Sequence, residues 1–139
     1  MKYLYLLITL LFSFTINGQS IIGHWETYDD VTQERKANIE IYKTDDVYFA
    51  RIVESYVSDK NATCKNCEGE RKNQPINGMI IIENIVKDGD EYNGGTILDP
   101  ENGKFYKCYL ELVKNNKLKV RGYIGVSLFG RTQYWLRKE

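Results

Sequence analysis

From Ile21 onward, short runs of β-branched and aromatic residues alternate with small clusters of Asp, Asn and Gly. No stretch repeats its apolar residues with the 3.6-residue period of an amphipathic helix. The pattern therefore predicts an all-β protein with eight strands. The predicted strands span residues 21–28, 37–44, 46–55, 78–86, 90–98, 104–114, 117–126 and 130–137.

Short turns separate most of these strands, and such turns join antiparallel neighbours. The turn residues are Asp45-Asp46, Asp88-Gly89, "DPENG" at 99–103 and Asn115-Asn116. Eight antiparallel strands in a small domain can close into a barrel, which leaves no exposed sheet edge. We therefore expect an eight-stranded antiparallel up-and-down β-barrel, with an open half-barrel or a sandwich as the alternative.

Alternation within the strands indicates which side chains point inward. The run Met-Ile-Ile-Ile at 79–82 does not alternate, which fits either a strand covered on both sides or a bulge. The expected inward residues of the strands that follow "DPENG" are Tyr106, Cys108, Leu110 and Leu112, and then Leu118, Val120, Gly122, Ile124 and Val126.

Aromatic residues mark both ends of the expected barrel, with Trp25 near its start and Trp135 near its finish. Lipocalins and fatty-acid-binding proteins are similar at both termini, with a tryptophan on the first strand covered by a late arginine. By this resemblance, Trp25 would plug the closed end of the barrel. A guanidinium from Arg121 or Arg137 would stack on it and contribute roughly 0.5–2 kcal/mol.

The first eighteen residues read as a secretory signal peptide, because Lys2 precedes an apolar run from Tyr3 to Ile16. Cleavage is expected between Gly18 and Gln19. Removal of residues 1–18 from the 139 leaves 121 residues, which form one small domain. We expect an exported protein that is periplasmic or secreted.

Charge and hydropathy exclude two classes of partner. The 19 basic and 19 acidic residues are interspersed, whereas nucleic-acid binding needs a clustered basic surface. After the leader, no stretch approaches the roughly 20 apolar residues of a membrane helix, so we expect a protein that is not membrane-integral.

Three cysteines allow one intramolecular disulfide and leave one thiol. Joining Cys64 to Cys67 would stabilise the fold by roughly 2 kcal/mol, and joining either to Cys108 by about 4. Strand parity places Cys108 inside the barrel, which favours the Cys64–Cys67 pair. A Cys₃His zinc site with His24 and a thioredoxin-like redox centre remain open alternatives, and the expectation is no metal and no cofactor.

Catalytic motifs are not evident. The chain has a single histidine and lacks the Gly-x-Ser-x-Gly elbow of serine hydrolases. Asp29-Asp30 and Asp99 fit turn formers, whose carboxylates bond nearby backbone amides. We therefore expect a protein that is not an enzyme and has no catalytic residues.

An ordered set of motifs resembles a bacterial family called domain of unknown function 2147. The resemblance implies an exported, lipocalin-like β-barrel without an established role. Two departures stand out: Gln33 replaces an expected turn glycine, and Lys65-Asn66 stand where an aspartate is more usual. The motifs are Gly23-x-Trp25, Asp29-Asp30, Cys64-x-x-Cys67-x-Gly69, Pro75-Ile76-x-Gly78, "GGTILDPENGKFY" at 94–106, "LKVRGYIG" at 118–125 and "GRTQYW" at 130–135.

Two functions remain in competition. The first is a barrel that binds a small apolar or amphipathic ligand in its interior. The second is a filled barrel that contacts an envelope protein, or another copy of itself as a homodimer, through the long loop at 57–77. The predicted ligand-binding residues are Trp25, Tyr106, Arg121, Tyr123 and Trp135.

Overall fold

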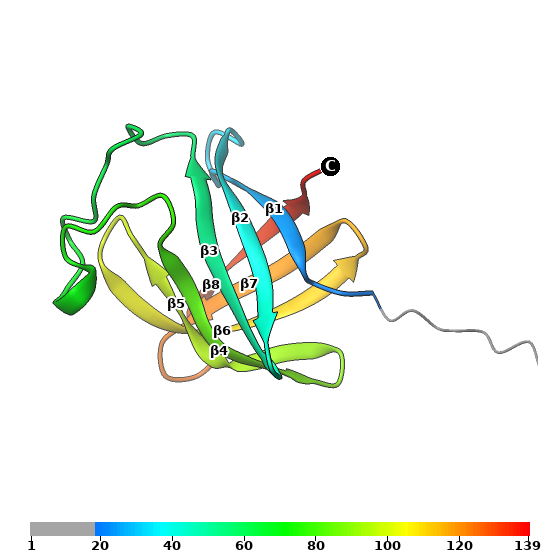
Figure 1. Ribbon diagram of the computed structural model, residues 1–139. Helices are drawn as coiled ribbons and strands as arrows, with labels where there is room; N and C mark the ends of the chain where they lie inside the picture. Colours follow the sequence, from blue (N-terminus) through cyan, green and yellow to red (C-terminus); the bar gives the residue numbers. More distant parts are fainter. Residues whose placement is uncertain (1–18) are drawn as a thin grey trace, which may run out of the picture.

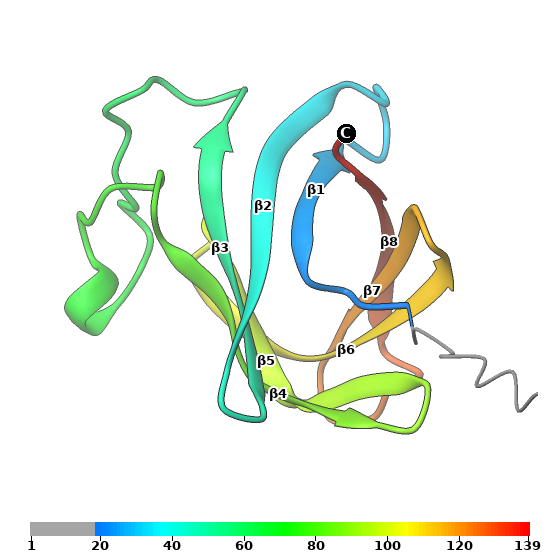
Figure 2. The ribbon, with the colours of Figure 1, turned by 45° about the vertical axis from the view of Figure 1, so that its right-hand side comes forward.

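The computed structural model describes residues 19–139, so the predicted leader and its cleavage site lie outside the described residues. Each strand pairs antiparallel with the next, and the last pairs with the first (Figures 1 and 2). This closed up-and-down barrel confirms the predicted fold. Its elements are β1 (Gly23–Tyr28), β2 (Arg35–Thr44), β3 (Val47–Ser55), the short 3-10 turn η1 (Gly69–Arg71), β4 (Ile80–Asp88), β5 (Glu91–Asp99), β6 (Lys104–Lys114), β7 (Lys117–Tyr123) and β8 (Gly130–Arg137).

Strand β4 contains a bulge, which is one of the two structures that the unbroken apolar run at 79–82 allowed. Between Tyr48 and Ala50 on β3, the paired residues of β4 shift from Ile85 to Ile82, so β4 carries one extra residue. Asn84 lies in this extra stretch with φ 60°, a left-handed conformation that asparagine tolerates. A second shift follows between Ala50 and Arg51. The bulges break the alternation, so consecutive isoleucines can both be buried.

Strand β7 ends earlier than predicted. It stops at Tyr123, and Gly125 then takes a φ of +71° as the chain turns away. Ile124 and Val126 are consequently 67% and 58% exposed, so their predicted place inside the barrel was wrong. The alternating apolar pattern of β7 continues into the loop, although these side chains lie on the loop surface. The pattern alone does not distinguish such exposed loop residues from inward strand residues.

Large side chains fill the half of the barrel nearest the β2–β3, β4–β5 and β6–β7 turns, which we call the closed end. Their inward strand positions exclude water from this half and form its apolar core. The core there includes Ile21, Trp25, Ile41, Tyr48, Ile82, Ile85, Tyr92, Leu110 and Leu118.

Trp25 and Arg137 seal this end. The Arg137 guanidinium carbon lies 4.3 Å from the centroid of the Trp25 ring, and the indole Nε1 donates to the Ile21 carbonyl at 2.8 Å. Arg137 also donates to the carbonyls of Asn115, Ile22 and Ser20, at 2.9, 3.0 and 2.7 Å. Arg137 is thus the arginine that stacks on Trp25, of the two that the sequence offered.

The seam between β1 and β8 is the least paired in the barrel. In the described chain, the register between these strands consists of Trp25–Arg137 and Glu26–Leu136. By contrast, β7 and β8 pair along the whole of β7. Toward the opposite, open end, β1 and β8 diverge (Figure 1).

Candidate functional site

A cavity of about 760 Å³ occupies the open half of the barrel. Its mouth is surrounded by the β1–β2, β3–β4, β5–β6 and β7–β8 connections, which all leave the barrel at this end. The barrel is therefore packed at one end and hollow at the other. A volume of this size lies within the usual range for small-molecule sites, about 300–1,000 Å³.

The inner wall of the cavity is apolar because inward strand positions supply it. These side chains are largely buried and carry no charge. Trp135 is 2% exposed, and its indole Nε1 has a long hydrogen bond of 3.4 Å to the Gln133 carboxamide. The apolar wall comprises Ile39, Ile52, Ile81, Ile97, Val120 and Trp135.

Gly122 keeps part of this lumen open. It occupies an inward position of β7, where a Cβ atom would meet Ile97 Cγ2 at 3.5 Å and Tyr106 Cβ at 3.7 Å. Both are ordinary van der Waals distances, so alanine would fit without strain. A larger side chain at this position would extend into the cavity.

Charged residues ring the mouth, and most of them are paired. Arg131 Nε lies 3.0 Å from Asp30 Oδ2, an ion pair that joins the β1–β2 turn to the start of β8 across the diverging seam. Lys36 Nζ lies 2.8 Å from Glu101 Oε1. These two ion pairs engage both cations of the mouth, whereas Asp29 and Asp99 take part in neither, so the mouth is polar and carries more acidic than basic groups.

Asp29 organises the β1–β2 turn. The backbone N–H groups of Thr32 and Val31 donate to its carboxylate at 2.8 and 2.9 Å, which lowers the pKa of Asp29 below its ordinary value. The neighbouring Gln33, which replaces the expected turn glycine, adopts a φ of 61°. The turn thus forms despite the substitution, at a position that costs a non-glycine residue some strain.

Three of the five predicted ligand-binding residues line the cavity: Tyr106, Tyr123 and Trp135. Trp25 lies instead in the sealed end. Arg121 faces outward, where its guanidinium donates to the Ser127 carbonyl at 2.9 and 2.7 Å and to the Thr132 hydroxyl at 2.8 Å. It therefore anchors the β7–β8 loop and is not among the residues of the cavity wall.

The early isoleucines of the wall were not predicted as site residues. Ile39 in β2, Ile52 in β3 and Ile81 in β4 line the cavity, as do exposed loop residues such as Val31. Alternation in β2 and β3 was the available signal for the first two. The inward position of Ile81 could not be inferred in this way, because the bulge interrupts the alternation in β4.

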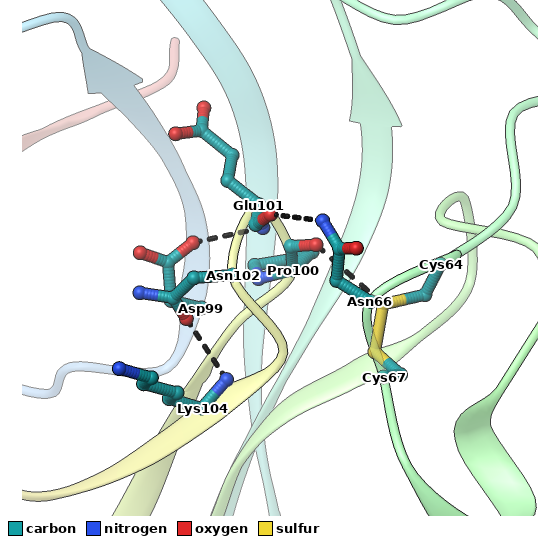
Figure 3. Close-up of a disulfide and its surroundings, with 8 residues drawn as sticks. All are labelled: Cys64, Asn66, Cys67, Asp99, Pro100, Glu101, Asn102 and Lys104. Atoms are coloured by element: carbon teal, nitrogen blue, oxygen red, sulfur yellow. Dashed lines mark hydrogen bonds between the residues drawn. A yellow bond between two sulfur atoms is a disulfide. The ribbon is translucent and has the colours of Figure 1, made fainter.

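A disulfide joins Cys64 and Cys67 within the long β3–β4 connection, with a Cα–Cα distance of 5.4 Å. Figure 3 shows this turn packed against the β5–β6 turn. Asn66 Nδ2 donates to the Glu101 carbonyl at 2.7 Å, and the Cys64 sulfur lies 3.5 Å from the Pro100 carbonyl oxygen. The disulfide closes the turn that carries Asn66, and the Asn66 hydrogen bond holds this turn against the β5–β6 turn.

Gly103 makes this contact possible. Its φ is +73°, and a Cβ atom there would collide with the backbone carbonyl of Asn66. The "DPENG" turn can approach the disulfide loop because glycine ends it.

The third cysteine, Cys108, is a free thiol in the barrel interior, where burial raises its pKa to about 12.

His24 belongs to a polar cluster on the outer surface and not to the cavity. Its Nδ1 lies 3.2 Å from Asn38 Oδ1, and its Nε2 lies 3.3 Å from Glu40 Oε2. Glu40 in turn pairs with Arg51 at 2.8 Å. Within residues 19–139, no three His, Cys, Asp or Glu side chains gather in a metal-binding arrangement.

The family comparison follows the extent of the barrel. Residues 23–137, which include all eight strands, match the model of DUF2147, described as "Uncharacterized protein conserved in bacteria". The chain belongs to this family. A comparison with curated proteins gives no match.

Among solved structures, the chain is similar to protein HP1028 from the human pathogen Helicobacter pylori, which is described as belonging to the lipocalin family. The TM-score is 0.76 at 17% sequence identity, and the alignment covers 86% of this chain and 84% of that chain. At this identity the likeness shows a shared lipocalin-like barrel.

No helix among the described residues is long and apolar enough to cross a membrane.

Proposed function

We propose that this DUF2147 protein is exported and binds a small apolar or amphipathic molecule in the cavity of its barrel. The cavity itself carries the proposal: its volume is about 760 Å³, its wall is apolar and its mouth is polar. Burial of apolar surface against such a wall contributes about 25 cal/mol per Å² before the costs of association.

The arrangement of polar groups favours a ligand with an apolar body and a polar end. No charged side chain belongs to the set of inward strand residues that form the inner wall. At the mouth, Tyr106 and Gln133 offer a hydroxyl and a carboxamide group. A ligand would place its polar end among these groups, because a polar group deeper in the barrel would lose its hydration without gaining partners.

The competing hypothesis of an interaction module depends on a filled lumen, and the cavity does not fit it. The loop at 57–77 is also tied to the β5–β6 turn, because Asn66 Nδ2 donates to the Glu101 carbonyl. Binding is favoured over catalysis because the single histidine is engaged on the outer surface.

Native mass spectrometry of the protein purified from its own host tests both parts of the proposal. A co-purifying molecule of a few hundred daltons is expected, on a chain whose mass corresponds to residues 19–139. Dansyl-undecanoic acid is a suitable probe for titration, because its fluorescence rises in an apolar site.

Gly122 provides the matched variants. Gly122→Leu should fill the lumen and weaken dansyl-undecanoic acid binding by at least about tenfold, whereas Gly122→Ala should bind within about threefold of wild type. Equal binding by all three proteins, or no binding by any of them, would refute the proposed site. Circular dichroism verifies that both variants remain folded.

A further inference from the structure

The most exposed apolar side chains of the protein surround the cavity mouth. Within residues 19–139, every large apolar side chain that is more than half exposed lies in a loop at the open end, from Val126 at 58% to Val31 at 90%. Scattered single apolar residues on a surface are ordinary, but a cluster at one end indicates an interaction site. The members are Val31, Val57, Ile124, Val126, Leu128 and Phe129, which we call the apolar rim.

The apolar rim is continuous with the cavity. Val31, Val57, Ile124 and Phe129 line the cavity as well as being exposed. Val126 and Leu128 do not line it and project from the β7–β8 loop, with Leu128 79% exposed. An apolar ligand that crossed this rim would remain in contact with apolar groups along its path.

The β7–β8 loop has its backbone carbonyls already bonded. The Val126 carbonyl accepts from the Phe129 N–H at 3.0 Å, and the Phe129 carbonyl accepts from the Ile124 N–H at 2.9 Å. The two carbonyls between them, of Ser127 and Leu128, accept from the Arg121 guanidinium. Four consecutive carbonyls thus have partners within the protein.

This hydrogen bonding suits the loop to an apolar medium. Lipid offers no donors, so an unbonded carbonyl would cost several kcal/mol there, whereas in water it would cost little. A loop that needed only to face water would not require Arg121 to satisfy its carbonyls. The combination of bonded carbonyls and outward apolar side chains fits insertion into the interfacial layer of a bilayer.

The charges around the mouth indicate which lipid surface it fits. The lining residues include the carboxylates of Asp29, Asp30, Asp99 and Glu101 against the cations of Lys36 and Arg131. The cavity mouth therefore has no excess of positive charge that would attract anionic lipids. A neutral, zwitterionic surface is therefore the better match.

We propose that the β7–β8 loop inserts into a zwitterionic lipid surface and docks the cavity mouth there, so that an apolar ligand passes between the bilayer and the barrel. This inference rests on the proposed ligand-binding function and adds the place where the ligand is exchanged. The contact is peripheral and reversible, since a few side chains from one loop supply it.

Flotation with phosphatidylcholine vesicles tests the docking, with protein comprising residues 19–139, which contain the whole closed barrel. The wild type should float. The double variant Val126→Asp/Leu128→Asp should lose about a hundredfold in vesicle partitioning, because each buried side chain contributes about tenfold. The matched control is Val86→Asp/Val113→Asp, which changes exposed residues on β4 and β6 and should partition like the wild type.

Fluorescence quenching by brominated phosphatidylcholine locates the contact. The native Trp25 and Trp135 are 0% and 2% exposed, so they should escape quenching. Leu128→Trp should be quenched, and Leu136→Trp, on the outer face of β8, should not. Quenching at both positions or at neither would overturn the proposed orientation.

Three further results would overturn the docking proposal: no flotation, flotation that requires anionic phosphatidylglycerol and disappears in salt, or a dimer in sedimentation that the double Asp variant dissociates. The ligand site is tested separately. Binding of dansyl-undecanoic acid in solution should be unchanged in the double Asp variant, because Val126 and Leu128 do not line the cavity. Vesicle binding without probe binding would reject the ligand site, whereas probe binding without vesicle binding would reject only the docking.

Discussion

Replacement of Arg137 by methionine should destabilise the barrel without hollowing it. The guanidinium stacks on Trp25 at 4.3 Å and donates to the carbonyls of Ser20, Ile22 and Asn115. Stacking of this kind contributes about 0.5–2 kcal/mol. Hydrogen bonds to a charged group contribute about 1.5–3 kcal/mol each at best, and less where solvent reaches them.

These contributions suggest a loss of about 2–4 kcal/mol in the free energy of unfolding. For a domain of this size, each kcal/mol corresponds to about 4 °C, so Arg137→Met should lower Tm by about 8–16 °C in differential scanning calorimetry. Methionine preserves the length of the aliphatic stem, so the change removes mainly the guanidinium. Arg137→Lys should fall between the two, because one ammonium group cannot reach all three carbonyls.

Arg131→Met serves as the control. Arg131 is an exposed arginine whose ion pair with Asp30 contributes at most about 1 kcal/mol. The Tm of the Arg131→Met variant should therefore differ from that of the wild type by less than about 4 °C. If Arg137→Met were no more destabilising than Arg131→Met, the closed end would not depend on the stacked guanidinium.

The remaining predictions concern a thiol and a glycine turn. Without reductant, Cys108 should give one reactive thiol per chain after denaturation and none in the native protein; three thiols would exclude the loop disulfide. Because burial raises the pKa of Cys108 from 9.0 to about 12, the folded protein binds the thiol proton more tightly, so the free energy of unfolding should fall as pH rises from 9 to 12, and Cys108→Ala should remove that component. Gly103→Ala should cost at least about 3 kcal/mol in urea unfolding, since it combines left-handed backbone strain with a collision at the disulfide loop. Gly69→Ala, at a similar φ with nothing near the added Cβ, should cost only about 1 kcal/mol, and equal costs would deny the packing of the two turns.

The topology was predictable because two independent signals in the sequence, the alternation within each strand and the short turn after it, indicate the same arrangement. Alternation with period two places one face inside, and a short turn such as Asp88-Gly89 leaves only an antiparallel neighbour within reach. These signals are local in the sequence. They predicted all eight strands, although several bounds differ by two residues, as for β4 (predicted 78–86, observed Ile80–Asp88), and apolar residues of the β7–β8 loop were assigned to a strand.

The hollow half of the barrel was not predictable in this way. Whether a lumen is filled depends on which inward side chains lie at the same height, and the register between strands decides that. Gly122 pairs with the small Cys108 on one side and, on the other, with Arg131, whose side chain extends to Asp30 at the mouth. A glycine within an alternating strand gives no sign of this from the sequence.

Arg121 shows a second limit of the sequence. Its outward parity was evident, yet the residues it bonds lie six and eleven positions later, on the next loop and strand. The predicted role at the cavity mouth assumed that a cation near the open end faces the ligand. In the structure the cation supports the loop from outside, because the turn after Tyr123 brings the Ser127 carbonyl back to it.

The Trp25–Arg137 seal and the two loop residues Val126 and Leu128 lie at opposite ends of the barrel, and this makes the docking variants informative. The closed end holds the buried core and the Trp25–Arg137 seal, so substitutions there report on folding. Val126 and Leu128 are mostly solvent-exposed in the free protein, so their removal deletes little packing and should leave the free energy of unfolding within about 0.5 kcal/mol of wild type. A loss of vesicle binding in such variants cannot then be attributed to unfolding, and it would have to arise from the surface that the loop presents.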